Sequence, residues 1–474
     1  MVLIWMSTLL QARDPWFEPF HENSIWNHPI GSGAQLVDAQ LGAESEIDIE
    51  VEYMFQTNWS DAAEDIHNPT NEWIGRWPGT FAWWLGKMHV PHNVYIEDSE
   101  PGYTPNNCAS FLMPDKTTLV QLNAATRLRN GAQIVGYRSP NVFLYGMGIR
   151  GEHGGSYLSN IGGTIRGHEW GSNKTINHAL KILVDTFQYL NYTSSNQGYR
   201  WPASRADAYA ADVYGGSVGA MRMGSLLTFQ PGTDYSDIGG LSTWQAKKIF
   251  DAIYNYGAYV VDDTAWPSYS IAAEDGVNIP TENSSFRSDM NKIFQALYVV
   301  NNNSENNIGG GGTVRTSKKS SLGAPDGGEI TLQAKANGKF IVAEWGGAGP
   351  LLSNRNGVGG WETFEVVDAG NGYIALRSLA NSKYVTVRSG DDVLIAAANS
   401  INDWERFQWV YKNDGKYIAL KAKKNNKYVS VNTSTLHLIA NKNSAGNNEK
   451  FTPGGGTGVW NEYGNSSYNG VPGQ

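Results

Sequence analysis

Residues 151–170, GEHGGSYLSNIGGTIRGHEW, combine several side-chain types that acid–base catalysis needs. His153 could exchange protons, and Arg166 or Glu169 could hold a substrate or orient a histidine. The paired glycines permit positive φ or a close approach of a ligand to the main chain. The alternative is a glycine-bulged pair of strands whose polar side chains satisfy loop backbone. We expect a functional segment, because a core would not gather four ionisable residue types.

A second acidic pattern is EIDIE at residues 46–50. In an extended strand Glu46, Asp48 and Glu50 share one face, with roughly 6.5–7 Å between successive members. Paired carboxyl groups about 5–5.5 Å apart suit retaining glycosidases, and about 6.5–9.5 Å suit inverting ones. These five residues resemble the E-x-D-x-E strand of laminarinase and lichenase type glycosidases, which implies that Glu46 is the nucleophile and Glu50 the acid/base. Glu52 extends the acidic face and is expected at a solvated edge.

Two further segments place polar residues beside aromatic rings. VVDDTAW brings Asp262 or Asp263 out of an apolar strand, where desolvation raises a carboxyl pKa, and one of the two is expected to cap the next turn. YRWPASRADAY has basic and aromatic groups that suit sugars or uronates, or else forms a proline-kinked corner. Catalysis is therefore assigned to Glu50, His153, Asp262 and Asp263. Stacking or charged contacts with substrate are assigned to Trp83, Trp84, Arg166, Trp170, Arg200, Trp201 and Trp266.

Metal and cofactor motifs are weak in this sequence. HVPH, with His89 and His92, lacks a third ligand, and Cys108 is the single cysteine, so neither a cysteine cluster nor an internal disulfide can form. The acidic run at residues 204–216 would suit a structural calcium ion but lacks the EF-hand pattern. We predict no metal and no other cofactor.

The elements that position these residues fall into more than one unit, because 474 residues exceed what a single core usually supports. The composition, with 54 Gly, 17 Trp and 24 Tyr, is typical of short strands that present rings to sugars. A net charge of −9 argues against nucleic-acid binding. Residues 327–453 are mildly basic, with 15 Lys and Arg against 11 Asp and Glu.

The C-terminal unit contains an internal repeat. Similar strings begin at Ile330, Ile374 and Ile418, a period of 44 residues. Three copies of about four strands predict a closed threefold arrangement over residues 329–453. This part resembles a fascin-like β-trefoil, which implies a carbohydrate-binding module. Phe340, Tyr384 and Tyr428 recur at one position and are predicted to be core, whereas Trp345 departs from the repeat and is the expected sugar contact.

In residues 13–300 alternating apolar residues predict mostly strands, with helical spacing in TWQAKKIFDAIYNYG and RSDMNKIFQALYVV. We predict a β-sandwich or jelly-roll-like domain with two or more helices. Residues 301–328, rich in Gly, Ser and Asn, are predicted to be a flexible linker, and residues 454–474 a flexible tail.

Residues 1–12 resemble the end of a signal peptide cut near Ala12, which predicts export, with a buried N-terminal strand as the alternative. No later stretch has the roughly eighteen apolar residues of a membrane span, so no membrane partner is predicted. Segments such as PFHENSIWNHPIG, TPNNCASFLMPD and YGAYVVDD resemble a group of secreted bacterial proteins, a resemblance that implies no particular activity.

The leading hypothesis is a secreted, monomeric glycoside hydrolase that the trefoil tethers to its polysaccharide. One alternative is a polysaccharide lyase acting on a uronic-acid polymer, with His153 or a tyrosine as base and Arg166 or Arg200 neutralising the carboxylate. The other is a non-catalytic glycan-binding protein.

Overall fold

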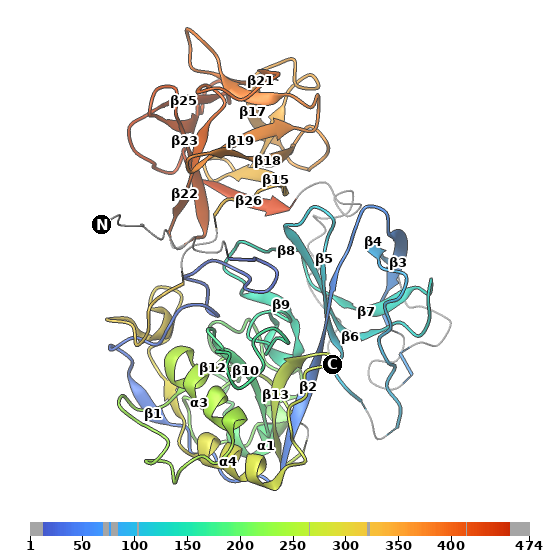
Figure 1. The fold of residues 1–474 in the computed structure, drawn as a ribbon, viewed down its shortest axis with the longest axis vertical. Helices are drawn as coiled ribbons and strands as arrows, with labels where there is room; N and C mark the ends of the chain where they lie inside the picture. Colours follow the sequence, from blue (N-terminus) through green and yellow to red (C-terminus); the bar gives the residue numbers. More distant parts are fainter. Residues whose placement is uncertain are drawn as a thin grey trace, which may run out of the picture.

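The computed structural model describes residues 13–69, 75–76, 84–101, 104–264, 266–319, 323–413 and 415–455. Figure 1 shows the C-terminal unit, coloured orange to red, at one end of a larger N-terminal unit. The described residues are mainly β, with few helices, as the sequence predicts. Among them no helix is both long enough and apolar enough to span a membrane. The predicted signal-like segment 1–12 and most of the predicted tail lie outside the described residues, while Gly454 and Gly455 belong to the last strand.

The described part of the N-terminal unit is built on one sheet of thirteen strands, twelve in a continuous hydrogen-bonded order and β8 paired with β6 beside it. Its strands are β1 (Leu36–Asp38), β2 (Glu46–Gln56), β3 (Ala62–His67), β4 (Trp84–Val90), β5 (Cys108–Leu112), β6 (Thr118–Thr126), β7 (Ile134–Arg138), β8 (Val142–Phe143), β10 (Leu180–Val184), β11 (Leu226–Thr228), β12 (Ala258–Asp263), β13 (Ser268–Glu274) and β14 (Tyr298–Val300). The short β9 (Arg150–His153) and the 3-10 turn η1 (Gly154–Ser156) lie outside this path.

Strand β2 lies in the middle of this sheet and pairs in parallel with β13 on one side and β5 on the other. Glu52 is therefore in register with both Glu274 and Cys108. Strand β2 runs from the helical lobe into the lobe of β3 to β7 (Figure 1). The predicted sandwich would consist of facing antiparallel sheets, whereas the strands here form one mixed sheet with parallel pairs. Residue alternation predicts strands but carries no information on which strands pair.

Helices pack against the part of the sheet opposite the β3 to β7 lobe, and this part is the helical lobe. They are α1 (Thr186–Tyr189), α2 (Ala210–Val213), α3 (Trp244–Tyr256) and α4 (Ser284–Gln295). Helix α3 begins at Thr243, whose side chain accepts from Ala246 N–H, and ends at Gly257, where φ is 85°. Its apolar stripe packs into the same core as α4, so both predicted helices are confirmed.

The C-terminal unit contains twelve strands: β15 (Glu329–Ala334), β16 (Phe340–Ala343), β17 (Leu351–Arg355), β18 (Thr363–Gly370), β19 (Tyr373–Ser378), β20 (Tyr384–Val387), β21 (Leu394–Ala398), β22 (Phe407–Lys412), β23 (Tyr417–Ala422), β24 (Tyr428–Val431), β25 (Leu438–Lys442) and β26 (Phe451–Gly455). Six of them close a barrel, because β15 pairs with β26 and β18, β19 with β18 and β22, and β23 with β22 and β26. The other six form three hairpins, β16–β17, β20–β21 and β24–β25. This is the predicted β-trefoil.

The trefoil core contains Ile330, Ile374 and Ile418, the first residues of the three repeated strings. Phe340, Tyr384 and Tyr428, predicted to be core, are only half-buried. Each stands at the start of a hairpin strand, where the side chain meets solvent and, at Tyr428, the ammonium groups of Lys412 and Lys421. A recurring position shows that the repeats are equivalent but not that the residue is buried.

The segment predicted to be a flexible linker is packed over its described residues 301–319. Gly31 N–H donates to Gly309 O at 3.0 Å, and Gly33 N–H donates to Gly311 O at 2.8 Å. Gly310 has φ of 87°, and a Cβ atom there would lie 2.5 Å from Ala34 Cα. The glycines therefore let two backbones approach closely, and the segment completes the N-terminal unit.

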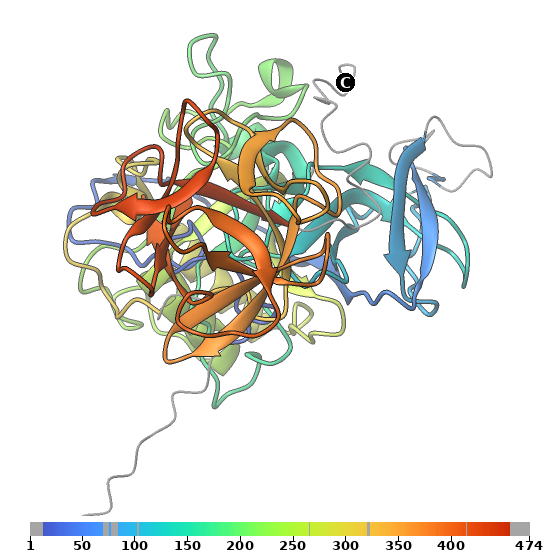
Figure 2. The same cartoon turned by 90° about the horizontal axis from the view of Figure 1, so that it is seen from above.

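The two units are in direct contact. Thr117 Oγ1 donates to Glu329 O at 2.8 Å, and Glu329 N–H donates to Asp115 O at 3.1 Å. The rings of His21 and Tyr411 lie 4.6 Å apart. Figure 2, seen from above, shows the trefoil over the helical lobe, with the β3–β4 lobe to one side. The trefoil is thus held against the N-terminal unit at several points.

Candidate functional site

Carboxyl groups from distant segments meet where β2, β12 and η1 approach one another. We call Glu50, Asp207, Asp262 and Asp263 the carboxylate cluster. Asn106 lies between two of its members: its Nδ2 donates to Asp262 Oδ2 at 2.7 Å, and its side chain is close enough to Glu50 to lower the pKa of that residue. Asp262 Oδ1 also accepts from Gly155 N–H at 2.8 Å. Three of the four predicted catalytic residues thus belong to one cluster, and the fourth, His153, lies directly beneath it.

The glycine pairs of residues 151–170 have two different roles. A Cβ atom on Gly154, where φ is 46°, would lie 1.8 Å from Asp262 Cγ, and one on Gly155 would lie 2.5 Å from Asp207 Oδ1. A Cβ atom on Gly162 would instead meet the ring of Trp26 at 2.3 Å. Without side chains, Gly154 and Gly155 leave room for the carboxyl groups of Asp262 and Asp207. Gly162 leaves room for the buried ring of Trp26.

Burial raises the pKa of the clustered acids. Desolvation, reinforced by the charge of Glu52, raises the pKa of Glu50 to about 8, although Lys181 and Arg76 oppose the shift. Desolvation and the charge of Asp207 raise the pKa of Asp263 to about 7. The pKa of Asp262 is raised well above its usual range, mainly by burial. The cluster can therefore hold protons at neutral pH, as a general acid must.

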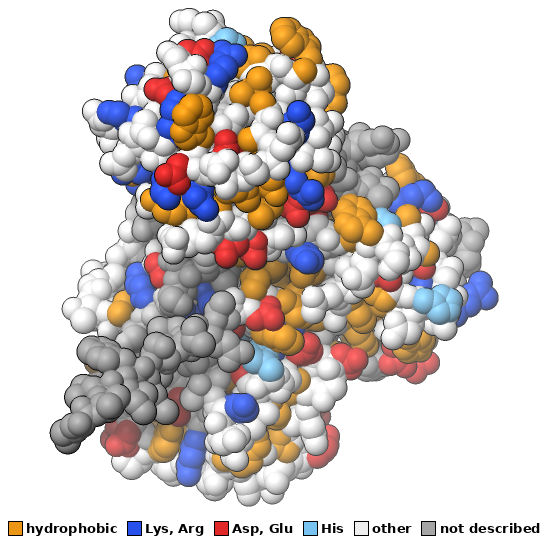
Figure 3. Space-filling view, turned by 45° about the horizontal axis from the view of Figure 1, so that its top comes forward, with side chains coloured by type: hydrophobic (Ala, Val, Ile, Leu, Met, Phe, Trp, Pro, Cys, Tyr) orange, Lys and Arg blue, Asp and Glu red, His pale blue; other side chains and the backbone are white. Residues whose placement is uncertain are grey.

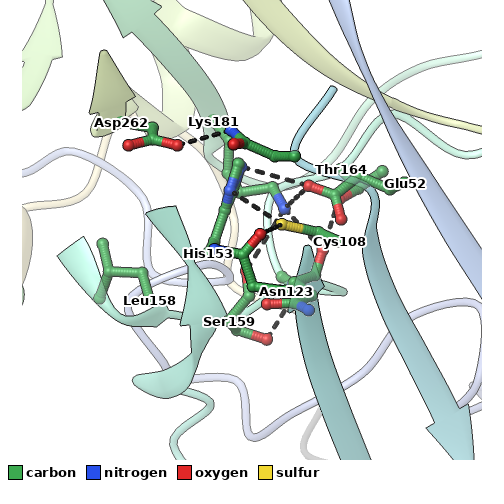
Figure 4. A network of polar contacts seen from close by, with 12 residues as sticks. Glu52, Cys108, Asn123, His153, Leu158, Ser159, Thr164, Lys181 and Asp262 are labelled. Carbon is green, nitrogen blue, oxygen red and sulfur yellow. Dashed lines mark hydrogen bonds and ion pairs between the residues drawn. The ribbon is translucent and has the colours of Figure 1, made fainter. Parts of the chain in front are cut away.

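A fully buried layer lies beneath this cluster (Figure 4). Glu52 forms an ion pair with Lys181, whose Nζ also donates to Asn160 O at 2.6 Å. His153 Nε2 lies 3.3 Å from Glu52 Oε1, and Cys108 Sγ lies 3.7 Å from His153 Nδ1. Burial lowers the pKa of His153 well below its usual value, so the ring is neutral. The expectation that Glu52 lies at a solvated edge is wrong, because Lys181 compensates its charge inside the protein.

Aromatic side chains lie where the cluster reaches solvent. Trp266 is 51% exposed, and its Nε1 donates to Asp48 Oδ2 at 3.2 Å. Tyr209 is 43% exposed, and its hydroxyl donates to Asp263 Oδ2 at 2.8 Å. Glu50 and Asp263 are themselves partly exposed. Tyr209 therefore brings an aromatic ring to Asp263, and Trp266 brings one to Asp48, two residues before Glu50 on β2.

Two predicted substrate contacts are engaged elsewhere in the helical lobe. Arg166 pairs with Glu274 at 3.1 Å, at the end of β13 farther from Trp266, and donates to Trp16 O. Trp170 Nε1 donates to Asn278 O at 2.9 Å. Trp170 also packs on Trp244 at the start of α3, with ring centroids 5.3 Å apart, so both side chains have partners within the protein.

The remaining predicted contacts also have other partners. Arg200 donates to Asn301 O at 2.6 Å, and Trp201 packs against an apolar core. Trp84 is 43% exposed on β4, in the other lobe, and its Nε1 donates to Asp65 at 2.8 Å. Trp83 lies outside the described residues. The assumption that scattered tryptophans share one groove does not hold for this set.

Sequence reasoning missed Asn106, Lys181 and Tyr209. Asn106 stands in TPNNC, which has the composition of an ordinary turn. Lys181 did carry a signal, since it interrupts the apolar run ALKILV, and a lysine in a buried strand needs a buried acid. Glu46, which the glycosidase resemblance makes the nucleophile, is exposed at the first residue of β2.

Comparisons with known proteins concern limited parts of the chain. A family described as a domain of unknown function (DUF7910) matches residues 325–452. No curated protein matches the sequence.

Among solved structures, a designed threefold symmetric protein, ThreeFoil, is 21% identical, with a TM-score of 0.25, over 26% of this chain and 96% of its own. SeviL bound to the asialo-GM1 saccharide is 16% identical, with a TM-score of 0.24, over 27% of this chain and 96% of its own. A mosquitocidal holotoxin is 9% identical, with a TM-score of 0.26, over 31% of this chain and 20% of its own. The β-trefoil assignment rests on the strand pairing described above.

Proposed function

We propose that the protein is a secreted glycoside hydrolase whose trefoil binds the polysaccharide that the carboxylate cluster cleaves. The observation that carries the proposal is that Asn106 donates to Asp262 and also lies close enough to Glu50 to lower its pKa, so both carboxyl groups adjoin one side chain. A retaining mechanism needs two carboxyl groups about 5–5.5 Å apart, and the position of both beside one amide side chain favours such a short separation.

In this mechanism Glu50 donates its proton to the glycosidic oxygen while the Asp262 carboxylate attacks the anomeric carbon and the bond to the leaving sugar breaks. Glu50, now ionised, removes a proton from water, and the resulting hydroxide displaces Asp262 from the sugar. Burial raises the pKa of Asp262, so this step uses the fraction of molecules in which Asp262 is ionised, and the hydrogen bonds from Asn106 and Gly155 N–H favour that form. Asp263 is the alternative second carboxylate.

Aromatic rings in both units support a glycan as ligand. Trp266 and Tyr209 flank the cluster, and Trp345 in the trefoil is 74% exposed at a residue with φ of 53°. Hydrophobic side chains reach the surface of the trefoil among lysine and arginine side chains (Figure 3). Exposed rings of this kind stack on the apolar faces of sugars. Export, which the signal-like residues 1–12 favour, would bring the enzyme to an extracellular polysaccharide.

The elimination alternative has less support. It needs an accessible base and an arginine to neutralise the uronate, but His153 is fully buried and Arg166 and Arg200 have other partners. A product with new unsaturation would nevertheless identify a lyase.

The test incubates the purified chain with cellulose, mixed-linkage glucan, xylan, pectin, alginate and algal galactans, and measures reducing ends and ultraviolet absorbance together. The proposal expects new reducing ends without new absorbance, and their loss in E50Q and D262N. Glycan retention with no cleavage of any of these polymers would instead support a non-catalytic binding protein.

A further inference from the structure

The buried layer beneath the carboxylate cluster contains three potential metal ligands from three strands. Glu52 lies on β2, Cys108 begins β5 and His153 ends β9. One ligand atom from each lies within 4.8 Å of those of the other two, and all three side chains are buried (Figure 4). We call these residues the buried triad. A thiol, an imidazole and a carboxyl group are the donor types that bind zinc in proteins.

Two polar atoms of the buried triad lack a hydrogen-bond partner. Within the described part of the chain, His153 Nε2 and Glu52 Oε2 are buried and have no hydrogen-bond partner. Buried polar atoms are normally satisfied, so each such atom calls for an explanation. A cation bound to Cys108 Sγ, His153 Nδ1 and Glu52 Oε2 would satisfy the unpartnered carboxylate oxygen, and His153 Nε2 would then face Glu52 Oε1, 3.3 Å away.

We propose that the buried triad binds a divalent transition-metal ion of borderline softness, and specifically Zn²⁺. The distance between Cys108 Sγ and His153 Nδ1 is 3.7 Å. A tetrahedral ion with bonds of about 2.3 Å to sulfur and about 2.0 Å to nitrogen would separate these atoms by roughly 3.5 Å. Glu52 supplies the third protein ligand, because one of its oxygens lies within 4.8 Å of the other two ligand atoms, and a water molecule takes the fourth position. The thiol proton leaves to solvent as the sulfur–metal bond forms.

Lys181 is compatible with this site. Its Nζ pairs with Oε1 of Glu52 and donates to Asn160 O, which leaves Oε2 for the ion. A positive group on the far oxygen of a ligating carboxylate orients that ligand. The thiolate and the carboxylate neutralise the charge of the ion.

The test exploits the single cysteine of the chain. The purified protein is dialysed against Zn²⁺ and then metal-free buffer, and bound zinc is measured. A second sample is loaded with Co²⁺, for which a thiolate ligand gives near-ultraviolet charge-transfer absorption. We expect about one zinc per chain and this absorption in the wild type, with loss of both in C108S and H153N. H178N is the matched control, because His178 pairs with Glu169 elsewhere.

Thermal unfolding distinguishes a variant that has lost the metal site from one that has failed to fold. Zinc should raise the Tm of the wild type and of H178N but not that of C108S, whose circular dichroism should match the wild type. Less than about a tenth of an equivalent of zinc in the wild type, or equal retention and absorption in C108S, would overturn the proposal. E50Q should keep the cobalt absorption, so failure of this site and failure of the hydrolase proposal give different results.

Discussion

In the trefoil, residues 43 or 44 apart in the sequence have the same structural role, whereas in the N-terminal unit residues 156 apart converge on one another. Glu362, Glu405 and Glu449 each accept the backbone N–H three residues earlier, at 2.8, 2.7 and 2.7 Å. Asn106 and Asp262 have no such counterparts. Repetition in this chain therefore indicates structure, and departures from it, such as Trp345, are where function is expected.

The largest expected effect concerns the carboxylate cluster. Glu50→Gln should lower glycan cleavage by about 10²–10⁴-fold, the usual contribution of a general acid. The side-chain shape is kept, so the unfolding transition should change little and trefoil binding to glycan should be unaffected. Initial rates of reducing-end release measure the effect, with Glu46→Gln, at the exposed start of β2, as the matched control. Equal losses in both variants would mean that the acidic strand acts only through its charge.

A second prediction uses the glycine that admits Asp262. Gly154→Ala places a methyl group against the Asp262 carboxyl group at a residue with positive φ. We expect a loss of about 2–4 kcal/mol in the free energy of unfolding, together with loss of cleavage. Gly360→Ala in the trefoil, where a Cβ atom meets nothing within 4 Å, should change stability by less than about 0.5 kcal/mol. Urea titration compares the two, and similar stabilities would refute the close approach.

A third prediction separates Trp345 from the repeated positions. Trp345→Ala should weaken retention on the substrate glycan roughly tenfold, or about 1–2 kcal/mol, because an exposed stacking ring is removed. The side chain of Trp404 is 43% exposed, and the ammonium group of Lys424 lies over its ring. Trp404→Ala should therefore have a smaller effect, because less of this ring is open to a sugar. Affinity electrophoresis in gels containing the glycan measures both. If Trp404→Ala had the larger effect, the second repeat would contain the binding site.

The smallest effect is a pH dependence. The pKa of Asp263 is about 7 in the folded chain and about 4 when unfolded, so between these values the folded state binds more protons. The contribution of Asp263 to stability is therefore present at low pH and is lost as pH rises from about 4 to 7. Asp263→Asn should make stability less dependent on pH in this window, whereas Asp212→Asn, on the exposed surface of α2, should not. The test is the Tm of the wild type and of both variants, measured from pH 4 to pH 8. An equal pH dependence in all three proteins would contradict the prediction.

Much of the fold could be predicted from local patterns. The period of 44 predicts the trefoil because each copy must bury the same isoleucine, and the stripe of α3 predicts its packing. The packed segment 301–319 could not be predicted, because a glycine that permits close backbone contact looks the same in sequence as one that permits flexibility.

The site could be predicted only in part. Glu50, Asp262 and Asp263 were found because acids in apolar strands are unusual. Asn106 and Tyr209 were missed because parallel pairing of β2 with β5 and β13, which brings their loops together, leaves no trace in local alternation. The tryptophans were over-assigned, because an indole N–H also needs a backbone or carboxylate partner.

The account depends on Glu50 and Asp262 acting as one unit through Asn106. A double-mutant cycle on glycan cleavage tests this most directly, with E50Q, D262N and the double variant compared with the wild type. The account predicts that each single variant loses nearly as much activity as the double variant, as for residues that act together. Losses that multiply in the double variant, or a wild type that cleaves none of the glycans, would contradict it.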